Sequence, residues 1–250
     1  MKTADVIIVG SGAAGLFNAL FLPQDYKVIV ITKKTVEESD SFLAQGGISA
    51  LKNPEDYDSY FEDTMKAGHY ENDKGAVEKM IKESPQIIQD LKDFGVRFDL
   101  KDGEIEFTRE GGHSTFRILH HEDLTGKEIT SHLYEEAKKR DNITIMENCM
   151  MIDIIEKDGE CKGIVYKDQD GNFDTIEAPD TVLATGGLGG LFKHSTNFRH
   201  LTADSLAICL RHCLRHNVEL ENINYIQIHP TTFYSKKPGR RFLISESVRG

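Results

Sequence analysis

The sequence predicts an α/β fold that is built on a parallel sheet and interrupted by a helical segment and a β-meander. Residues 6–9 form a β-branched, apolar run that predicts a fully buried strand, and a helical pattern follows over residues 16–22. Gly10, Gly12 and Gly15 stand between them with the spacing G-x-G-x-x-G. Residues 27–32 predict a second buried strand, so the chain opens with a βαβ unit whose strands are parallel.

Each glycine of this turn has a predicted role. Gly10 permits the tight turn, Gly12 lets the backbone approach a pyrophosphate, and Gly15 lets the helix pack closely on the strand. The start of the helix offers free N–H groups and a partial positive charge to phosphates. An ordinary glycine-rich turn is the alternative, but the position between a strand and a helix favours a dinucleotide site of the Rossmann type.

The end of the second strand departs from a simple NAD site. An NAD-binding unit usually has Asp or Glu there, where its carboxylate holds the ribose. Here the strand ends in Thr32 and Lys33. The sequence therefore argues against an NAD-dependent dehydrogenase.

A helical segment is predicted after the first two strands. Apolar residues recur every three or four positions after Pro54, and a second helix is predicted over residues 76–94. Ser84-Pro85 predicts a start or a kink within that second helix. A third amphipathic helix is predicted over residues 127–140.

A β-rich block follows. Strands are predicted over residues 143–147, 151–157, 161–167 and 173–178, with a hairpin turn at 158–160 and a polar turn at 168–172. Residues 181–185 predict a buried strand that runs directly into a glycine-rich stretch. Thr185 and Gly186 at this junction predict a second place where the backbone approaches a ligand closely.

Composition restricts the possible partners and locations. The 250 residues allow one large α/β domain or two small ones. The net charge of −11 argues against nucleic acid or an anionic membrane as a partner. No signal peptide, no membrane-spanning run and no disulfide framework among the four cysteines is evident, so we expect a reduced, cytoplasmic protein.

No metal site is expected. Cys209 and Cys213 would share one face of a helix, whereas His212 and His216 would lie on another. This splits the possible zinc ligands, and a helix with buried thiols is the favoured interpretation.

Three loops are candidates for chemistry. Residues 108–123 gather Arg, His and carboxylate side chains around a Gly-Gly pair, which indicates either a loop that presents charge to a small polar ligand or a solvated connection. His229 closes a segment (226–229) that has a strand-like pattern, and a structural histidine is the more common interpretation there. Residues 39–48 form a Gly-Gly loop beyond the second strand, on the side of the sheet where ligands bind.

Five segments, in this order and at these intervals, resemble one family: residues 10–15, 41–47, 109–121, 185–187 and 227–231. This family comprises the flavoprotein subunits of succinate dehydrogenase and fumarate reductase, together with the L-aspartate oxidases. Thr-Arg-Glu-Gly-Gly-His-Ser at residues 108–114, with Arg-Ile-Leu-His at 117–120, is most similar to the oxidase branch.

The resemblance implies FAD as the cofactor. Carried over by position, Lys33 would lie near the adenosine half, and Asp204 near the ribityl or pyrophosphate region. Asp40 stands where respiratory members have a histidine bound covalently to the flavin, so non-covalent FAD is expected. The expected pyrophosphate ligands are Gly10, Ser11, Gly12, Ala14 and Gly15, and those along the isoalloxazine are Ser41, Gln45, Gly46 and Gly47.

The resemblance also implies a reaction. Glu110, His229 and Ser245 would contact the substrate, with the Glu110 carboxylate near an amine that aspartate has and succinate lacks. The implied activity is oxidation of L-aspartate to iminoaspartate, the first step of de novo NAD biosynthesis, with electrons passed to O₂ or fumarate. The unstable product would pass to quinolinate synthase.

Some expected parts lie outside these 250 residues. The arginine that serves relatives as general acid or base is not in the sequence, so the chain alone is expected to be inactive. We expect an FAD-binding domain over 1–229 and the beginning of a capping domain over 230–250. Two alternatives stay open: a soluble fumarate reductase or succinate dehydrogenase-type flavoprotein, and a nucleotide-binding module without catalysis.

Overall fold

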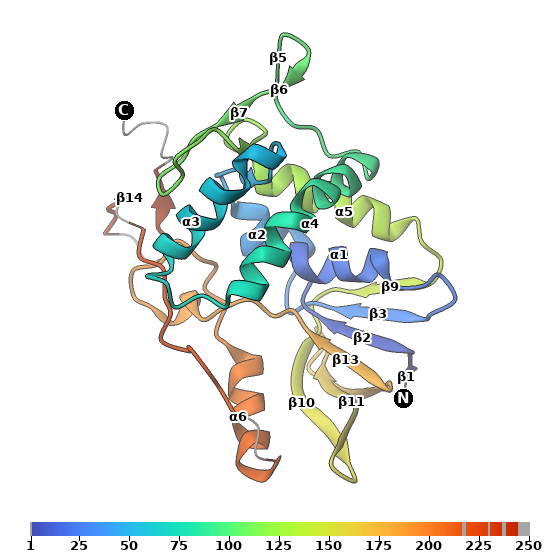
Figure 1. Cartoon of the computed structure of the whole chain (residues 1–250). Coiled ribbons are helices and arrows are strands. Elements are labelled where there is room, and N and C mark those ends of the chain that lie inside the picture. The colour runs from blue at the N-terminus through green and yellow to red at the C-terminus, as the bar shows by residue number, and fades with distance from the viewer. Residues whose placement is uncertain (1, 217–218, 230, 237–238, 245–250) are drawn as a thin grey trace. The chain divides into compact units, whose positions relative to one another are not determined.

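A computed structural model describes residues 2–216, 219–229, 231–236 and 239–244, with the backbone alone over residues 213–216 (Figure 1). The chain divides into two compact units. The first consists of Met1–Phe42 and Leu133–Ile244, and the second of Leu43–His132. The second unit is therefore an insertion in the sequence of the first.

The first unit contains the predicted parallel sheet. Its strand order is β13 (Asp180–Leu183), β2 (Val6–Val9), β3 (Val28–Ile31) and β9 (Ile143–Met146). All neighbouring pairs are parallel, and Val6 aligns with both Asp180 and Val28. Every residue of β2 and β3 is buried, as continuous β-branched runs predict for a sheet that is covered on both faces.

A second sheet covers one face of the parallel sheet. Its strand order is β1 (Lys2–Thr3), β12 (Phe173–Glu177), β11 (Glu160–Lys167) and β10 (Met150–Lys157). Strands β10, β11 and β12 form the predicted antiparallel meander. Asp158 and Gly159 both have positive φ at the predicted hairpin turn, as a type I′ turn requires.

The core of the first unit lies between these two sheets. Ile7, Val9, Ile29 and Ile31 alternate along β2 and β3 and pack against residues of the meander, among them Ile164. Helix α6 (Asp204–His216) adds Ile208 to this cluster. Helix α1 (Ala13–Phe21) lies beside β2 and β3 and buries Leu16, Ala19 and Leu20 (Figure 1).

Short elements complete the first unit. They are the 3₁₀ helices η1 (Val36–Glu38) and η3 (Gly189–Leu191), helix α2 (Asp40–Leu43), which reaches the unit boundary, and the antiparallel pair β14 (Thr232–Phe233) and β15 (Phe242–Leu243).

The second unit combines helices with short strands. The 3₁₀ helix η2 (Pro54–Asp56) leads into α3 (Tyr57–Ala67), which packs beside α4 (Lys74–Asp93) (Figure 1). Tyr60 and Met65 of α3 and Val77 and Ile81 of α4 form its buried cluster. A three-stranded antiparallel sheet has the order β4 (Ile48–Ser49), β8 (Ile118–Leu119), β7 (Phe107–Thr108).

Two further elements belong to this part of the chain. The hairpin of β5 (Leu100–Lys101) and β6 (Glu104–Ile105) follows α4 and precedes β7 in the sequence. Helix α5 (Thr125–Lys138) begins in the second unit and ends in the first.

Pro85 lies inside α4, which begins at Lys74 and continues to Asp93, so Ser84-Pro85 is not a helix start. Proline has no N–H for the carbonyl of Ile81, four residues earlier. The Ser84 hydroxyl donates to that carbonyl instead, at 2.7 Å. The same hydroxyl accepts the Leu51 N–H at 2.8 Å, so the serine compensates for the proline.

Two predicted strands are wrong in detail. Strand β13 is not buried: it ends at Leu183, which is 38% exposed and lines a cavity at the end of the sheet. Residues 226–229 form no strand, and Ile228 is 87% exposed. Among the residues that the structure describes, no strand pairs with this alternating segment.

Candidate functional site

The glycine turn between β2 and α1 has the close packing that the motif predicts. Gly10 has φ +115°, and a Cβ on it would lie 2.1 Å from the Ala184 carbonyl oxygen. A Cβ on Gly15 would lie 1.9 Å from the Gly10 carbonyl oxygen, so helix and turn approach each other in a way that no other residue permits. Gly12 is the N-cap residue of α1 and supplies no side-chain cap.

A cavity of about 500 Å³ opens beside this turn, within the first unit. The carboxyl ends of β2, β3 and β13 line it, together with the start of α6. This is the edge of a parallel sheet at which α/β proteins bind ligands. Among the expected cofactor residues, the cavity is lined by Gly10, Ser11, Gly12, Ala14, Lys33, Ser41, Thr185, Gly186 and Asp204.

One serine of this cavity fits a phosphate ligand. Ser11 is 2% exposed, and its hydroxyl has no hydrogen-bond partner among the described residues. A buried hydroxyl of this kind needs a partner, and a phosphate oxygen would supply one. The Ser41 hydroxyl accepts the Ala13 N–H at 3.0 Å, at the start of α1.

Lys33 and Asp204 form an ion pair in the wall of the cavity. Lys33 Nζ lies 2.5 Å from Asp204 Oδ2 and also donates to the His200 carbonyl at 2.7 Å and to Thr202 Oγ1 at 2.9 Å. Thr202 Oγ1 donates in turn to the other Asp204 oxygen, at 2.8 Å. Lys33 and Asp204 therefore hold the end of β3 to the start of α6.

Further side chains of the cavity order its other walls. Thr185 Oγ1 hydrogen-bonds Ser205 Oγ, at the junction between β13 and the glycine-rich stretch. The Asp40 carboxylate accepts the Phe198 N–H at 3.1 Å and also bonds Asn197. Burial lowers the pKa of His200, so this histidine tends to be neutral beside the cavity.

Glu110, the expected substrate residue, lies in the second unit beside the Gly46-Gly47 loop. Its Oε1 accepts the Gly47 N–H at 3.1 Å, and a Cβ on Gly46 would meet the same carboxylate at 3.3 Å. Gly47 has no room for a side chain, because its Cβ would lie 2.3 Å from the Leu119 carbonyl oxygen. Gln45 Oε1 is buried and has no hydrogen-bond partner among the described residues.

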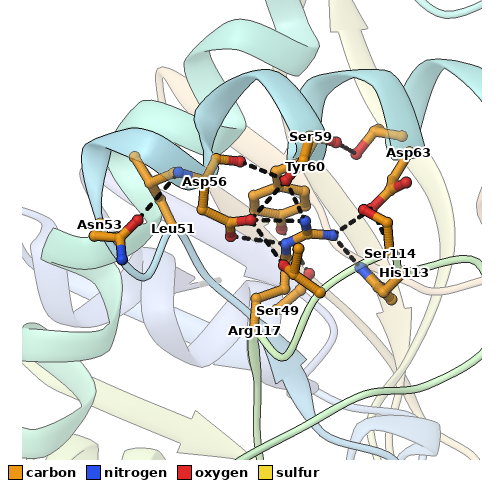
Figure 2. Close-up of polar contacts among 12 residues, drawn as sticks. Ser49, Leu51, Asn53, Asp56, Ser59, Tyr60, Asp63, His113, Ser114 and Arg117 are labelled. Atoms are coloured by element: carbon orange, nitrogen blue, oxygen red, sulfur yellow. Dashed lines mark hydrogen bonds and ion pairs between the residues drawn. The ribbon is translucent and has the colours of Figure 1, made fainter.

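The charged loop is neither fully solvated nor wholly available to a ligand. Arg117 is completely buried, and its guanidinium pairs with Asp56 and Asp63 on η2 and α3 (Figure 2). His120 and His121 lie against Asp99, with Nδ1 to oxygen distances of 3.1 and 3.5 Å. Arg109, Glu122 and Asp123 of this loop remain exposed, and Glu110 is half-buried.

The remaining expected site residues have less defined surroundings. His229 is half-buried, and its Nδ1 accepts the Thr231 N–H at 3.1 Å. Ser245 lies outside the described residues. In α6, His212 contacts Asp153 and Glu156, and Cys209 is half-buried rather than buried; the side chains of Cys213 and His216 lie outside the description.

The part of the chain that the structure describes contains no group of three His, Cys, Asp or Glu side chains suited to a metal ion. In the same residues, no helix is both long and apolar enough to cross a bilayer.

A sequence model of the FAD-binding domain matches residues 5–250. The chain belongs to the FAD-binding domain family. Its predicted cofactor, FAD, is thereby confirmed, and the orphaned Ser11 hydroxyl beside the glycine turn of this FAD-binding domain fits a phosphate of that cofactor.

Several curated relatives of this FAD-binding domain are L-aspartate oxidases. The enzyme of Clostridium perfringens is 46% identical over 250 residues, which are 100% of this chain and 56% of that protein. The enzyme of Clostridium acetobutylicum is 47% identical over 248 residues, which are 98% of this chain and 56% of that protein. The chain thus spans little more than half the length of these relatives.

Solved structures agree with the predicted fold. A flavocytochrome c3 fumarate reductase in an open conformation has a TM-score of 0.85 at 25% identity. The match covers 99% of this chain and 46% of the reductase chain. An Escherichia coli quinol fumarate reductase has a TM-score of 0.81 at 28% identity, and the match covers 85% of this chain and 38% of the reductase chain. The predicted α/β class and the family resemblance are therefore confirmed.

The ion pairs of Arg117 are not predicted by the local sequence pattern. One signal was present: Arg117 directly precedes the apolar pair Ile118–Leu119, and a charge beside a buried strand needs partners. Asp56 and Asp63, which are those partners, lie 61 and 54 residues away, so local pattern could not connect them.

Proposed function

We propose that this chain is the FAD-binding part of an enzyme that oxidises L-aspartate to iminoaspartate. The observation that carries the proposal is the 46% identity with an L-aspartate oxidase over all 250 residues. The glycine turn, the cavity and the Glu110 loop are the parts that such an enzyme needs. FAD, when bound, supplies the hydride acceptor.

The cofactor would lie with its phosphates at the start of α1. The helix dipole favours an anion there, and the Ser11 hydroxyl would gain a partner. Lys33 and Asp204 would order the adjoining wall, with Thr185 and Gly186 on another side of the same cavity. Gln45, Gly46 and Gly47 would face the isoalloxazine.

Non-covalent attachment of FAD belongs to the same proposal. Asp40 replaces the histidine that links the flavin in respiratory relatives, and its carboxylate is engaged by Phe198 and Asn197. Acid precipitation should therefore release all of the flavin into the supernatant. Flavin that stays with the precipitate would contradict this part of the proposal.

Glu110 would select an amino dicarboxylate. A carboxylate attracts the ammonium group of aspartate, and succinate and fumarate have no such group. His229 would hydrogen-bond a substrate carboxylate, and Ser245 would contact the substrate as well. With the substrate so held, the bond from Cα to hydrogen can be oriented toward the acceptor.

The decisive experiment is Glu110→Gln in the full-length gene product. Glutamine keeps the hydrogen bond from Gly47 and removes the charge, so kcat/KM for L-aspartate should fall about 10- to 100-fold. Glu104→Gln, an exposed residue of β6, is the matched control. Unchanged turnover of aspartate by Glu110→Gln would contradict the recognition of the amine by Glu110.

A soluble fumarate reductase is the second candidate, because both fumarate reductase structures share this fold at 25–28% identity. It would reduce fumarate without discriminating in favour of an amine, and Glu110→Gln would leave it active. A binding module without catalysis would take up FAD and turn over neither compound.

Two broader statements stay predictions of this proposal. The first is the division into an FAD-binding domain over 1–229 and the beginning of a capping domain over 230–250. The second is the context: a cytoplasmic reaction, electron transfer to O₂ or fumarate, and delivery of iminoaspartate to quinolinate synthase.

A further inference from the structure

The three-stranded sheet of the second unit joins the two loops that the proposed function uses. Strand β4 follows directly after Gln45, Gly46 and Gly47, and β7 runs directly into Arg109 and Glu110. The central strand β8 pairs with both: Ile118 aligns with Ser49 on one side and with Thr108 on the other. The residue just before β8 therefore stands at the common base of both loops.

That residue is Arg117, and each of its five N–H donors has a partner (Figure 2). Nε and one Nη2 hydrogen reach the two Asp56 oxygens, both at 2.8 Å. The other Nη2 hydrogen reaches Ser59 Oγ at 2.8 Å. Nη1 contacts Asp63 Oδ2 at 2.6 Å and His113 Nδ1 at 3.0 Å.

The same two carboxylates hold the loop itself. Asp63 Oδ2 accepts both the backbone N–H and the hydroxyl of Ser114, each at 2.7 Å. Asp56 Oδ1 accepts the Thr115 hydroxyl at 2.7 Å. Residues 113–115 are thus tied to η2 and α3 directly, and also through Arg117.

The network also reaches β4. The Tyr60 ring lies 4.8 Å from the guanidinium carbon of Arg117, and its hydroxyl donates to Ser49 Oγ at 2.6 Å. The Ala50 N–H donates to the Arg117 carbonyl at 3.1 Å. One side chain therefore connects the strand that follows Gly46-Gly47 with the loop that contains Glu110.

A buried arginine with two carboxylates is a poor way to gain stability. The cost of removing these charges from water is about as large as their attraction, and apolar residues of similar size stabilise at least as well. Five bonds in one plane do, however, fix geometry closely. Position, more than stability, is what such an arrangement provides.

We propose that Arg117 is a positioning residue for the substrate loop, defined here as residues 109–116. Clamped by Asp56 and Asp63, it fixes His113 and Ser114 and thereby sets where Glu110 stands beside Gly47. The His113 ring accepts a hydrogen bond from Arg117, and the His113 backbone N–H donates to the Glu110 carbonyl at 3.2 Å. The role in substrate binding rests on the proposed function, whereas the clamp itself does not.

The state of His113 agrees with this arrangement. Burial and the adjacent Arg117 charge lower the pKa of His113. Its Nδ1 must be unprotonated to accept from Nη1, so the neutral ring with the proton on Nε2 is the form that the clamp requires.

The test uses the full-length protein with Asp63→Asn and Arg117→Lys. Lysine keeps the charge but has three donors that lie outside a plane, so it should not replace arginine. Asp58→Asn is the matched control, since it removes an exposed carboxylate from the same helix. Ser114→Ala, which removes one exposed hydroxyl, serves if the stronger variants do not fold.

Two readouts separate positioning from a general structural role. Trypsin should cleave after exposed Arg109 about tenfold faster in both variants, because the loop opens more often. KM for L-aspartate should rise about tenfold with kcat within about twofold and FAD content unchanged. The control should match the wild type in each measurement.

The outcomes divide clearly. Wild-type cleavage and KM in folded Asp63→Asn or Ser114→Ala would overturn the clamp, and so would a loss of kcat with unchanged KM. Full activity of Arg117→Lys would overturn the requirement for five planar donors. Faster cleavage alongside a Glu110→Gln variant that turns over aspartate normally would support the clamp and contradict the proposed function.

Discussion

Asp56 shows what a buried guanidinium does to a single carboxyl group. Hydrogen bonds from Arg117 lower the pKa of Asp56 from 3.8 to about 2, with smaller contributions from Ser59 and Thr115. The folded state therefore binds the proton less readily than the unfolded state does. This linkage contributes about 2 kcal/mol of stability above the unfolded pKa.

The contribution should disappear as the pH falls from about 4 to about 2, because the unfolded chain then takes up a proton that the folded chain excludes. Urea unfolding at pH 7, 4 and 2.5 measures it. Asp56→Asn should lose stability at pH 7 and have a flatter profile below pH 4, whereas exposed Asp58→Asn should keep the wild-type profile. Parallel profiles for wild type and Asp56→Asn would contradict the assigned cause.

Gly15 is a second residue whose substitution should have a large effect, because the structure leaves no room for one added carbon atom. Alanine would place a Cβ 1.9 Å from the Gly10 carbonyl oxygen, so either α1 or the turn must move. Gly15→Ala should lower FAD affinity at least about tenfold and cost several kcal/mol of stability, as overpacked sites do. Titration of flavin fluorescence and thermal unfolding measure both effects.

Gly111→Ala is the matched control for Gly15→Ala, because a Cβ at Gly111 meets no atom within 4 Å. It should bind FAD as the wild type does. Equal FAD affinity in Gly15→Ala and wild type would show that the close approach of helix and turn is not needed for the cofactor.

Helix α4 shows how one element tolerates a residue that should break it. The Ser84 hydroxyl serves both the Ile81 carbonyl and the Leu51 N–H. Ser84→Ala should cost about 1–3 kcal/mol, because it leaves two buried backbone groups unpaired. Chemical denaturation of the chain and of this variant measures the difference.

The control for that prediction is the double variant Ser84→Ala with Pro85→Ala. Alanine at 85 restores an N–H for the Ile81 carbonyl, so part of the lost stability should return. If the double variant is no more stable than Ser84→Ala, the hydroxyl does not stand in for the missing N–H. In that case, only a kink in α4 would explain how the helix tolerates Pro85.

The elements also show which features local sequence can predict. Strands β2 and β3 follow from unbroken β-branched runs, and the turn at Asp158-Gly159 follows from residues that accept positive φ. The exposure of Leu183 is different. This residue lines the cavity at the end of β13, and nothing in the local sequence predicts that.

The candidate site divides in the same way. The glycine turn and the ends of β2 and β13 came together at one cavity, as parallel strands with adjacent carboxyl ends require. The pairing of Lys33 with Asp204, 171 residues apart, and that of Arg117 with Asp56 depend on tertiary structure. Charge in a loop predicts that partners exist, but not which residues they are.

At the scale of the whole molecule, FAD should stabilise the chain against unfolding. A ligand that binds only the folded state adds about 2.7 kcal/mol at 100 times its Kd. For a protein of this size the melting temperature should rise by roughly 5–10 °C. Thermal scans with increasing FAD measure the shift, and Gly15→Ala should reduce it.

NAD at equal concentration is the control for that measurement. The strand end at Thr32 and Lys33 has no carboxylate for a nicotinamide dinucleotide's ribose, so NAD should leave the melting temperature unchanged. Equal stabilisation by both dinucleotides would contradict the preference for FAD.

The insertion of residues 43–132 has a consequence for the synthesis of the protein on the ribosome. Strand β2 is complete at Val9, yet its neighbours in the sheet are β3 and the much later β13, which begins at Asp180. At typical elongation rates β13 emerges on the order of 10–30 s after β2. During that interval the four β-branched residues of β2 lack one neighbouring strand. The parallel sheet of the nascent chain should therefore stay incomplete until translation has passed β13.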